Sequence, residues 1–341
     1  MIILGIETTC DETSASLVKD GTEILSQVIF SQEDIHAHYG GVFPEMAARR
    51  HVDVIHKTIE LAFTKARLTP KDIDGIAVAY TPGLMGSLLI GVNTAKSLCL
   101  AWDKPLIGVN HVEAHLYAAM MQTDLSKIAF PSLGLVISGG HTLLFEISSF
   151  TNYSVIASTQ DDAIGEAFDK VAILLGYSYP GGAKIEKIAE KGNPLAYPFK
   201  PARVKKSLLD FSYSGLKTAV LYAVQNKILT DQEKADIAAS FQRAAFKTIL
   251  QKLALLCSKK TYPYLFVGGG VAANQYFRKE LSLLFKENFY FPSLELCQDN
   301  AAMIAGFGFQ KLKKNRKGDP LDLEPMPRAP FATCENFNFS V

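Results

Sequence analysis

The chain has 341 residues and is 48% hydrophobic, which is enough for two lobes with sizeable cores and excludes a disordered protein. Its formal net charge of +1 excludes binding of polyanions through a global field, so a nucleic-acid partner must contact local basic clusters. The five cysteines are scattered and lack C-x-x-C spacing, which excludes a zinc ribbon and is typical of reduced thiols.

The first residues form the apolar run IILGI, without the basic leader that a targeting segment would carry. No uninterrupted apolar stretch approaches the ~18 residues that a membrane-spanning helix needs. We therefore expect a soluble, cytoplasmic protein with no membrane contact.

Strand-like runs alternate with helix-length segments along the chain, and this order predicts an α/β fold with mixed sheets. The expected strands are IILGIE, SASLVK, EILSQVIF, GIAVAY, LIGVN, LGLVIS, TLLFEIS, YSVIAST and YLFVG. The expected helices cover about residues 44–67, 85–101, 111–121, 165–176, 231–258 and 299–313. Beyond Lys313 the sequence is Pro-rich and charged, which predicts a surface extension or tail over residues 314–341.

One pattern occurs twice. The segments that start at Leu4 and at Leu133 both read as strand, short polar turn, strand, polar turn, strand. Such a repeat, with each copy followed by helices, predicts a duplicated two-lobed chain with a central cleft. We expect lobe I to contain residues 1–128 and 300–325, and lobe II to contain residues 129–299.

The stretch NHVEAHLYAAM, residues 110–120, places His111 and His115 four residues apart on a predicted helix. At that spacing both imidazoles can face one metal ion. The zinc protease pattern H-E-x-x-H requires a glutamate where this chain has Val112, and the inverted pattern fails at Ala114. Glu113 lies about 200° round the helix from His111. The pair is therefore either a metal site of another kind or two structural histidines.

A third ligand is available in QDNAAMIAG, residues 298–306, where Asp299 stands at a predicted helix start. Asp299 could cap that helix. Its carboxylate could instead complete a His-His-Asp site, a donor set that suits zinc or iron.

Three Gly-rich or hydroxyl-rich loops could approach a nucleotide. ETTCDETS (7–14) and SGGHT (138–142) lie at equivalent turns of the repeat and are either ordinary β-turns or the two sides of a phosphate clamp. VGGGVAAN (267–274) leads from a strand into a helix that begins near Asn274, a shape suited to close approach of a nucleoside.

DDAIGEAFDK, residues 161–170, concentrates carboxylates at a helix start. Asp161 and Asp162 are typical of an acidic first turn that the helix dipole favours. Asp169 is a stronger candidate for ligand binding, because YPGG (179–182) follows the helix and could place a backbone amide near the same ligand.

Together these motifs resemble one known family. GIETTCDETS, HVEAH, VISGGHT, DDAIGEAFDK, YPGG, FSYSGLKTA, GGGVAAN and DNAAMIA span residues 5–305 and are similar to the bacterial tRNA adenosine threonylcarbamoyltransferases, within the actin, Hsp70 and sugar-kinase-like superfamily. The resemblance implies that superfamily's two-lobed fold. It also implies transfer of a threonylcarbamoyl group from threonylcarbamoyl-AMP to N6 of the adenosine just 3′ of the anticodon, in tRNAs reading codons that begin with A.

The resemblance also implies site residues. One divalent ion, Fe²⁺ or alternatively Zn²⁺, would be bound by His111, His115 and Asp299. The implied substrate contacts are Val136, Ile137, Ser138, Gly139, Gly140, Asp169, Gly182 and Asn274. Archaeal and eukaryotic relatives have a tyrosine that can add a metal ligand at the position of Val136. Asp11 and His141 lie on loops from which they could accept the N6 proton, and are the candidate catalytic residues.

The implied partners are tRNA, an inactive paralogue of the same fold and a small P-loop ATPase. Candidate tRNA contacts are the basic clusters Arg49 with Arg50, KPARVKK (200–206) and KLKKNRK (311–317), each of which could equally be a solvated surface. Three alternative functions remain open: a metal-dependent glycoprotein endopeptidase, an ATPase or kinase of the superfamily, and a non-catalytic nucleotide-binding scaffold.

Overall fold

The computed structural model describes residues 1–200, 204, 207–285, 287–329 and 331–333. The chain divides into two compact units. Unit 1 comprises Met1–Ile128, Ser148–Tyr153 and Tyr290–Phe331, and unit 2 comprises Ala129–Ile147, Ser154–Phe289 and the described residues from Ala332 on. Residues 290–299, which we expected in lobe II, belong to unit 1, where α10 (Leu294–Cys297) contacts α4 (His111–Met120).

The sheet of unit 1 has the strand order β3-β2-β1-β4-β5 within the described chain. The first three strands form an antiparallel meander, and the last two run parallel to β1. The mixed sheet predicted from the sequence is therefore confirmed. The strands are β1 (Ile2–Glu7), β2 (Glu12–Lys19), β3 (Glu23–Ser31), β4 (Gly75–Thr81) and β5 (Leu106–Asn110).

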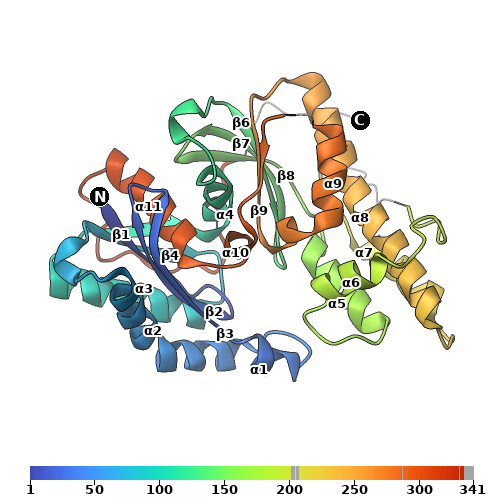
Figure 1. The fold of residues 1–341 in the computed structure, drawn as a ribbon, viewed down its shortest axis with the longest axis horizontal. Coiled ribbons are helices and arrows are strands. Elements are labelled where there is room, and N and C mark those ends of the chain that lie inside the picture. The colour runs from blue at the N-terminus through green and yellow to red at the C-terminus, as the bar shows by residue number, and fades with distance from the viewer. Residues whose placement is uncertain (201–203, 205–206, 286, 330, 334–341) are drawn as a thin grey trace. The chain divides into compact units, whose positions relative to one another are not determined.

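Helices cover both faces of this sheet (Figure 1). The long helices α2 (Pro44–Ala66) and α3 (Met85–Trp102) pack on one face, and α11 (Ala301–Lys314) packs on the other. Pro44 stands in the first turn of α2, where its missing N–H leaves no hydrogen bond unmade. The shorter elements of unit 1 are α1 (Glu33–Ala37), η1 (Pro70–Asp72) and η2 (Leu125–Lys127).

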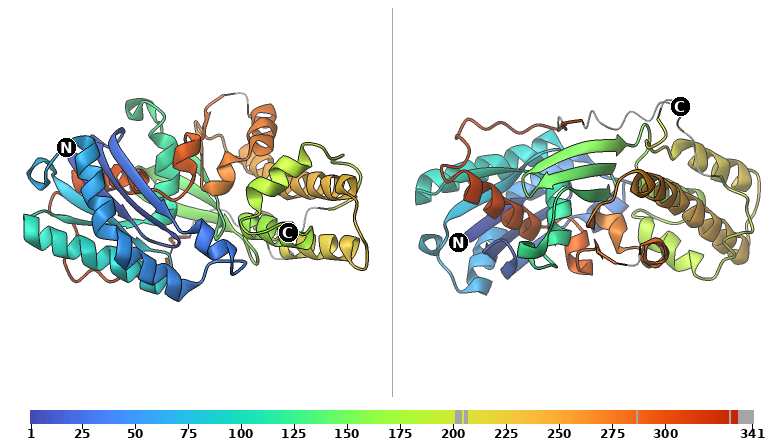
Figure 2. Two further views of the ribbon diagram at one scale, coloured as in Figure 1. Left: turned by 60° about the horizontal axis from the view of Figure 1, so that its bottom comes forward. Right: turned by 90° about the horizontal axis from the view of Figure 1, so that it is seen from above.

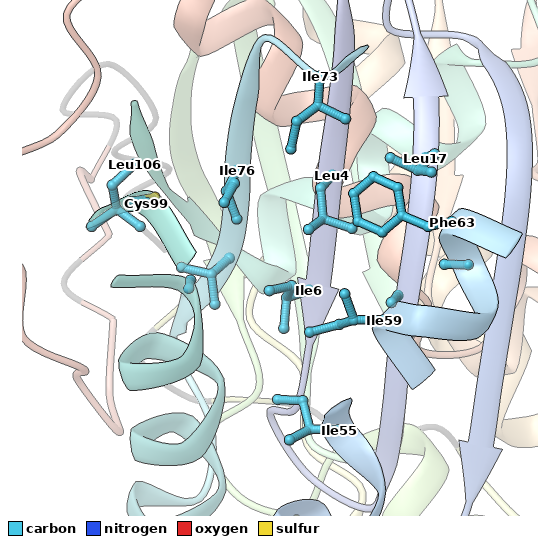
Figure 3. Close-up of a cluster of buried hydrophobic side chains, with 14 of the residues drawn as sticks. Leu4, Ile6, Leu17, Ile55, Ile59, Phe63, Ile73, Ile76, Cys99 and Leu106 are labelled. Atoms are coloured by element: carbon cyan, nitrogen blue, oxygen red, sulfur yellow. The ribbon is translucent and has the colours of Figure 1, made fainter. Parts of the chain in front are cut away.

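The core of unit 1 follows from the alternation of side chains along β1. Leu4 and Ile6 are fully buried and face Ile59 and Phe63 of α2, as Figure 3 shows. Gly5 points the opposite way, toward α11, where an added Cβ would lie 2.2 Å from the carbonyl oxygen of Ala301. Glycine at this position therefore lets α11 approach the strand closely.

The sheet of unit 2 has the order β10-β9-β6-β7-β8 within the residues that the structure describes. Its β6-β7 pairing is antiparallel, like β1-β2 of unit 1, and its β6-β9 pairing is parallel, like β1-β4. The predicted duplication is therefore confirmed. The strands are β6 (Ser132–Ile137), β7 (Thr142–Ser149), β8 (Asn152–Ser158), β9 (Leu265–Gly268) and the short β10 (Phe289–Tyr290).

Helices α5 to α8 of unit 2 pack against one another (Figure 2). The long helix α8 begins with a capping box, in which Thr230 and Glu233 each satisfy a backbone N–H of the other residue. The helical elements are α5 (Ile164–Leu174), α6 (Gly182–Ala189), α7 (Ser214–Val224), α8 (Asp231–Lys259), η3 (Gly270–Ala273) and α9 (Gln275–Leu284). Both α6 and α7 were missed by the sequence analysis.

Residues 315–329, part of the expected tail, form a strap along unit 1. The N–H of Asp319 donates to Leu106 O at 2.7 Å, and the Asp319 carboxylate accepts from the N–H of Gly108 at 2.7 Å. Further along, the N–H of Met326 donates to Tyr80 O. Backbone hydrogen bonds thus connect the strap to the edge strand β5 and to its neighbour β4. In the part of the chain that the structure describes, no helix has the length and apolar character needed to cross a membrane.

Candidate functional site

Both candidate ligand histidines lie at the start of α4. Asn110 caps this helix, because its side chain accepts from the backbone N–H groups of Val112 and Glu113. His111 and His115 are 7% and 1% exposed, and their ring centroids are 4.7 Å apart. The cap therefore starts the helix at His111 and brings both imidazoles to one buried position.

Asp299 completes this cluster from the segment before α11. Of the two roles considered for Asp299, helix cap or metal ligand, the cap is excluded, because α11 starts at Ala301 and Asn300 accepts the N–H of Met303 as its cap. The carboxylate of Asp299 is consequently not used as a cap. Its Oδ1 atom lies 3.1 Å from Nε2 of His115 and 3.5 Å from Nε2 of His111.

These separations fit ligands of one metal ion. Ligand bonds of about 2.0–2.2 Å to a tetrahedral ion place any two ligand atoms ~3.3 Å apart. Among the described residues, His111, His115 and Asp299 are the group whose ligand atoms converge, all within 4.8 Å of one another, and Glu113 is not part of it. Nε2 of His115 faces the Asp299 carboxylate at 3.1 Å, and its Nδ1 has no hydrogen bond among the described residues, so Nε2 is the nitrogen that lies where a shared metal ion would bind.

The charges of the cluster favour a cation. Burial opposes protonation of His111, but the carboxylates of Glu7 and Asp299 outweigh burial and raise the pKa of His111 well above its usual value. Burial alone would raise the pKa of Asp299, yet His111 beside it holds that pKa well below the usual range. For His115, burial lowers the pKa. Two carboxylates thus draw positive charge to this position in unit 1.

Two neighbours of the metal ligands were missed by the sequence analysis. Glu7, the last residue of β1, is fully buried and its Oε2 lies 2.9 Å from Nδ1 of His111. The hydroxyl of Thr9 lies 3.3 Å from the same nitrogen. A carboxylate at the end of the apolar run IILGIE was a usable signal, because a charged residue in a buried strand requires a partner.

Asp11, a candidate catalytic residue, lies on the loop that follows Thr9. This loop is held by backbone contacts: the carbonyl of Cys10 contacts His51 Nε2 at 3.0 Å, and that of Asp11 accepts from the N–H of Gln32. Burial, and then the carboxylate of Asp11, raises the pKa of the Cys10 thiol. The catalytic role of Asp11 stays a prediction.

The turn Ser138–His141 in unit 2 joins the antiparallel strands β6 and β7. The N–H of Ser138 donates to His141 O at 2.9 Å, and its hydroxyl accepts from the N–H of His141 at 3.1 Å. Gly139 and Gly140 are exposed, and added Cβ atoms there would meet nothing within 4 Å. The turn therefore presents the backbone of its two glycines.

The two residues that precede the turn can also offer a ligand only their backbone atoms. Val136 and Ile137 are 0% exposed in β6, so a ligand would meet them through their backbone. Two glycines pack directly under the turn: added Cβ atoms would lie 2.6 Å from Ser138 O at Gly165, and 2.4 Å from Ile137 O at Gly269. Close backbone packing thus fixes the position of the turn within unit 2.

The remaining predicted substrate contacts of unit 2 have structural partners. The Asp169 carboxylate accepts from the N–H of Gly181 at 2.7 Å, so YPGG binds Asp169 directly. Gly182 opens α6, where first-turn N–H groups lack helical partners. The side chain of Asn274 accepts from the N–H of Phe277 as the cap of α9 and donates to Gln242. These roles leave one amide hydrogen of Asn274 for a ligand.

The acidic first turn predicted for Asp161 and Asp162 is wrong, because α5 starts at Ile164, beyond both residues. The Asp161 carboxylate instead accepts the N–H groups of Tyr213 and Ser214 at the start of α7. Asp162 forms ion pairs with Lys170 and Lys217 at 2.9 and 2.7 Å. Asp161 therefore connects the segment before α5 to the start of α7, and Asp162 connects α5 itself to α7.

The basic clusters differ in their contacts. In KLKKNRK, Lys311 donates to Gly108 O and lies 3.8 Å from the Asp319 carboxylate, so it holds the strap, whereas Lys313 and Arg316 are exposed. Arg50 pairs with Asp53 on α2. In KPARVKK, the predicted contacts Lys205 and Lys206 lie outside the described residues.

Two mixed sheets with the same meander define the class: an α/β protein of the actin, Hsp70 and sugar-kinase-like fold. Solved structures agree on the fold. HypF of T. kodakarensis matches with a TM-score of 0.61 at 15% identity, over 92% of this chain and 48% of that one. Component A of the Acidaminococcus fermentans (R)-2-hydroxyglutaryl-CoA dehydratase matches with a TM-score of 0.54 at 15% identity, over 92% and 99% of the two chains.

The chain belongs to the tRNA N6-adenosine threonylcarbamoyltransferase family, whose model matches residues 23–306. A curated relative of that name from Protochlamydia amoebophila is 50% identical over 343 residues, covering 98% of this chain and 100% of the relative. One from Chlamydia trachomatis serovar L2b is 50% identical over 337 residues, covering 96% and 98%. The resemblance stated from the motifs is confirmed.

Proposed function

We propose that this chain transfers the threonylcarbamoyl group of threonylcarbamoyl-AMP to N6 of the adenosine 3′ of the tRNA anticodon, with a divalent ion bound by His111, His115 and Asp299. Family membership makes the chain a transferase that modifies tRNA adenosine. The observation that carries the metal assignment is the convergence of these three buried or half-buried side chains. The endopeptidase alternative is not favoured, because Glu113 is outside the cluster and Val112 occupies the place of the protease base.

The reaction explains why such a site is needed. The N6 amine of adenine is a poor nucleophile, so the carbamoyl carbon must arrive activated as a mixed anhydride with AMP. A bond forms from N6 to that carbon, the bond from carbon to phosphate oxygen breaks, AMP leaves, and N6 loses a proton. A bound divalent ion would supply positive charge for a phosphate or carbonyl oxygen as AMP departs.

The residues of unit 1 hold that charge in place. His111 and His115 offer neutral nitrogen donors, Asp299 offers one carboxylate oxygen, and Asn110 and Asn300 fix the helix starts on which they depend. Glu7 adds a second negative charge beside His111. Two imidazoles with one carboxylate suit both Fe²⁺ and Zn²⁺, and the family resemblance favours Fe²⁺.

The residues of unit 2 are proposed substrate contacts. Gly139 and Gly140 would donate backbone N–H groups to the adenylate phosphate, since both are exposed and have no side chain to block approach. Val136 and Ile137 would contribute backbone atoms, and Ser138, Asp169, Gly182 and Asn274 complete the proposed set. His141 and, in unit 1, Asp11 are the proposed acceptors of the N6 proton.

The proposed partners are tRNA, an inactive paralogue of the same fold and a small P-loop ATPase, and the proposed location is the cytoplasm. Lys205 and Lys206 are proposed to contact tRNA phosphates. Neutralising both should weaken tRNA binding and its salt dependence while leaving adenylate binding intact. Unchanged tRNA affinity across salt concentrations would assign KPARVKK to the solvated surface.

The test is reconstitution. Purified protein with its partners, threonylcarbamoyl-AMP and unmodified tRNA should yield threonylcarbamoyl-adenosine, detected by nucleoside mass spectrometry, and an equal amount of AMP. Fe²⁺-loaded and Zn²⁺-loaded protein should be compared with chelator-treated protein. Metal-dependent cleavage of casein or a glycoprotein, with no modified tRNA, would overturn the proposed function.

A further inference from the structure

We propose that Glu7 is a positioning residue for the metal site, holding His111 in the tautomer that presents Nε2 to the ion and so setting metal affinity. The inference rests on the metal site of the proposed function and concerns a residue outside its ligand set. Glu7 ends β1, whereas His111 starts α4, so the contact joins the central strand of unit 1 to the ligand helix.

The carboxylate of Glu7 is fixed on both sides. Its Oε1 accepts the backbone N–H of Thr9 at 2.6 Å, and its Oε2 lies 2.9 Å from Nδ1 of His111. Its side chain is 0% exposed, so water does not compete for either oxygen. A buried charge with two such partners has one favourable orientation, because loss of either hydrogen bond would leave the charge under-solvated.

This orientation determines what His111 can do. A carboxylate accepts and cannot donate, so Nδ1 keeps a hydrogen toward Glu7, and Nε2, 3.5 Å from Asp299, is the nitrogen whose proton a metal ion can replace. Carboxylate–histidine pairs of this kind orient metal ligands and raise their basicity. His115 has no such partner among the described residues, so Glu7 orients one of the two imidazoles.

The substitution Glu7→Gln tests whether the carboxylate of Glu7 orients His111 or whether its side chain only fills space in the core. The amide has the same size but one accepting oxygen, so it cannot accept from both Thr9 and His111. If its NH₂ faces His111, the ring is driven to the tautomer with hydrogen on Nε2. We expect a 10–100-fold loss of Zn²⁺ affinity, measured by chelator competition on the protein alone, the range seen when outer partners of metal ligands are removed.

Glu113→Gln is the matched control, because it makes the same change of carboxylate to amide on the ligand helix α4, at a residue outside the metal cluster. It should leave Zn²⁺ affinity within twofold of wild type. Thermal unfolding of the metal-free variants reports whether either change acts through stability. Glu7→Gln with affinity within twofold of wild type, or an equal loss in both variants, would overturn the proposal.

A measurement on the wild-type protein keeps the test decisive if Glu7→Gln does not fold. In Zn²⁺-loaded, ¹⁵N-histidine-labelled protein, His111 should show a hydrogen on Nδ1 and metal on Nε2. Metal on Nδ1 would overturn the role of Glu7 without affecting the transferase assignment. Conversely, a wild-type protein that binds Zn²⁺ as described but forms no modified tRNA would contradict the proposed function and leave this inference standing.

Discussion

The metal cluster of unit 1 and the Ser138–His141 turn of unit 2 differ in which atoms they offer to a ligand, side-chain atoms in the first and backbone atoms in the second. The metal cluster of unit 1 consists of side chains far apart in sequence: His111 and His115 come from α4, and Asp299 from the segment before α11. The Ser138–His141 turn of unit 2 is contiguous, and its two glycines present backbone. The metal cluster depends on side-chain atoms that converge on one point, and the turn depends on the absence of side chains at its two glycines.

This difference determines what a substitution does. In the metal cluster, removal of a side chain removes a ligand and leaves other buried charges without a partner. In the turn, addition of a methyl group is the informative change. Cβ atoms at Gly269 and Gly165 would clash with the turn, whereas Gly139 and Gly140 have open space around them. Substitutions in both regions can therefore test this contrast.

The largest effect is expected in the metal cluster. His111→Ala, His115→Ala and Asp299→Ala each remove one of three protein ligands, so each should lose bound metal and most transfer activity, by more than the ~100-fold typical of outer partners. Metal content by plasma mass spectrometry and single-turnover tRNA modification are the measurements.

Asn300→Ala is the neighbouring control for Asp299→Ala. Asn300 caps α11, donates to Leu296 O and Gln298 O, and is not a ligand, so its loss should cost about 1–3 kcal/mol of unfolding free energy while Zn²⁺ still binds. Should Asp299→Ala retain stoichiometric metal, the convergence of the three side chains would have another cause.

The next effect is expected below the turn of unit 2. Gly269 has φ +94° and ψ 161°, a region open essentially to glycine, and an added Cβ would lie 2.4 Å from Ile137 O. Gly269→Ala should cost ~2–4 kcal/mol of unfolding free energy, as strain and overpacking combine. Urea unfolding measures this cost.

Gly140→Ala should show the opposite behaviour. With no neighbour within 4 Å, the added methyl should change stability by less than ~0.5 kcal/mol. Binding of a non-hydrolysable threonylcarbamoyl-adenylate analogue should nevertheless weaken, since the methyl lies where the phosphate would approach. Unchanged affinity in this variant would reduce the turn to a structural element.

A pH-dependent effect is expected on the other side of α4. Burial raises the pKa of Glu113 from 4.5 to about 7, with partial relief from Lys311. The folded protein therefore holds this proton more tightly than the unfolded chain, and stability falls as pH rises from about 4.5 to 7. Glu113→Gln should remove this loss and stabilise the protein by ~1–3 kcal/mol at pH 8, with little effect at pH 4.

The measurement is chemical unfolding of metal-free wild type and Glu113→Gln at both pH values. Although Glu113 points away from the metal ligands, its side chain is partly buried, and this burial is the cause of the expected effect. Equal stability of the two proteins at pH 8 would show that Glu113 ionises without penalty.

The smallest effect is expected at exposed basic residues of unit 1. Neutralising Lys313 and Arg316 should lower the slope of log K for tRNA against log salt by about 1 for each phosphate that is no longer neutralised. Fluorescence anisotropy at several salt concentrations measures the slope. Lys311→Gln provides the comparison, because Lys311 binds the strap and should affect stability more than tRNA affinity.

Much of the fold could be predicted from sequence because its strands are continuous apolar runs. All nine predicted strand segments are found, and the long helices α2, α3 and α8 end within a residue of the expected limits. Among the missed elements, α1, α10 and β10 have five, four and two residues, too few to show a period. The missed helices α6 and α7 are longer, with 8 and 11 residues, and length does not explain their omission.

The candidate site was predictable to a different degree. His111 and His115 follow from local spacing, but Glu7 is 104 residues away from its partner, so no local pattern could connect them. Asp and Asn both cap helices, so the sequence could tell whether Asp299 or Asn300 is the cap only if it located the helix start to within one residue. Backbone contacts such as Gly269 against Ile137 carry no residue-type signal beyond glycine itself.

The approach of α11 to β1 has a consequence for synthesis of the protein. The first strands of unit 1 leave the ribosome early, but the helix that packs against Gly5 starts at Ala301. At ~5–20 residues per second, the ~170 residues between Ile128, where the first segment of unit 1 ends, and Ala301 take roughly 10–35 s to translate. Unit 2, whose sheet and helices are encoded almost entirely in that interval, can therefore complete its fold first. Until then the N-terminal sheet lacks the helix that covers Gly5, and exposed apolar sheet surface of this kind is what chaperones bind and what aggregates.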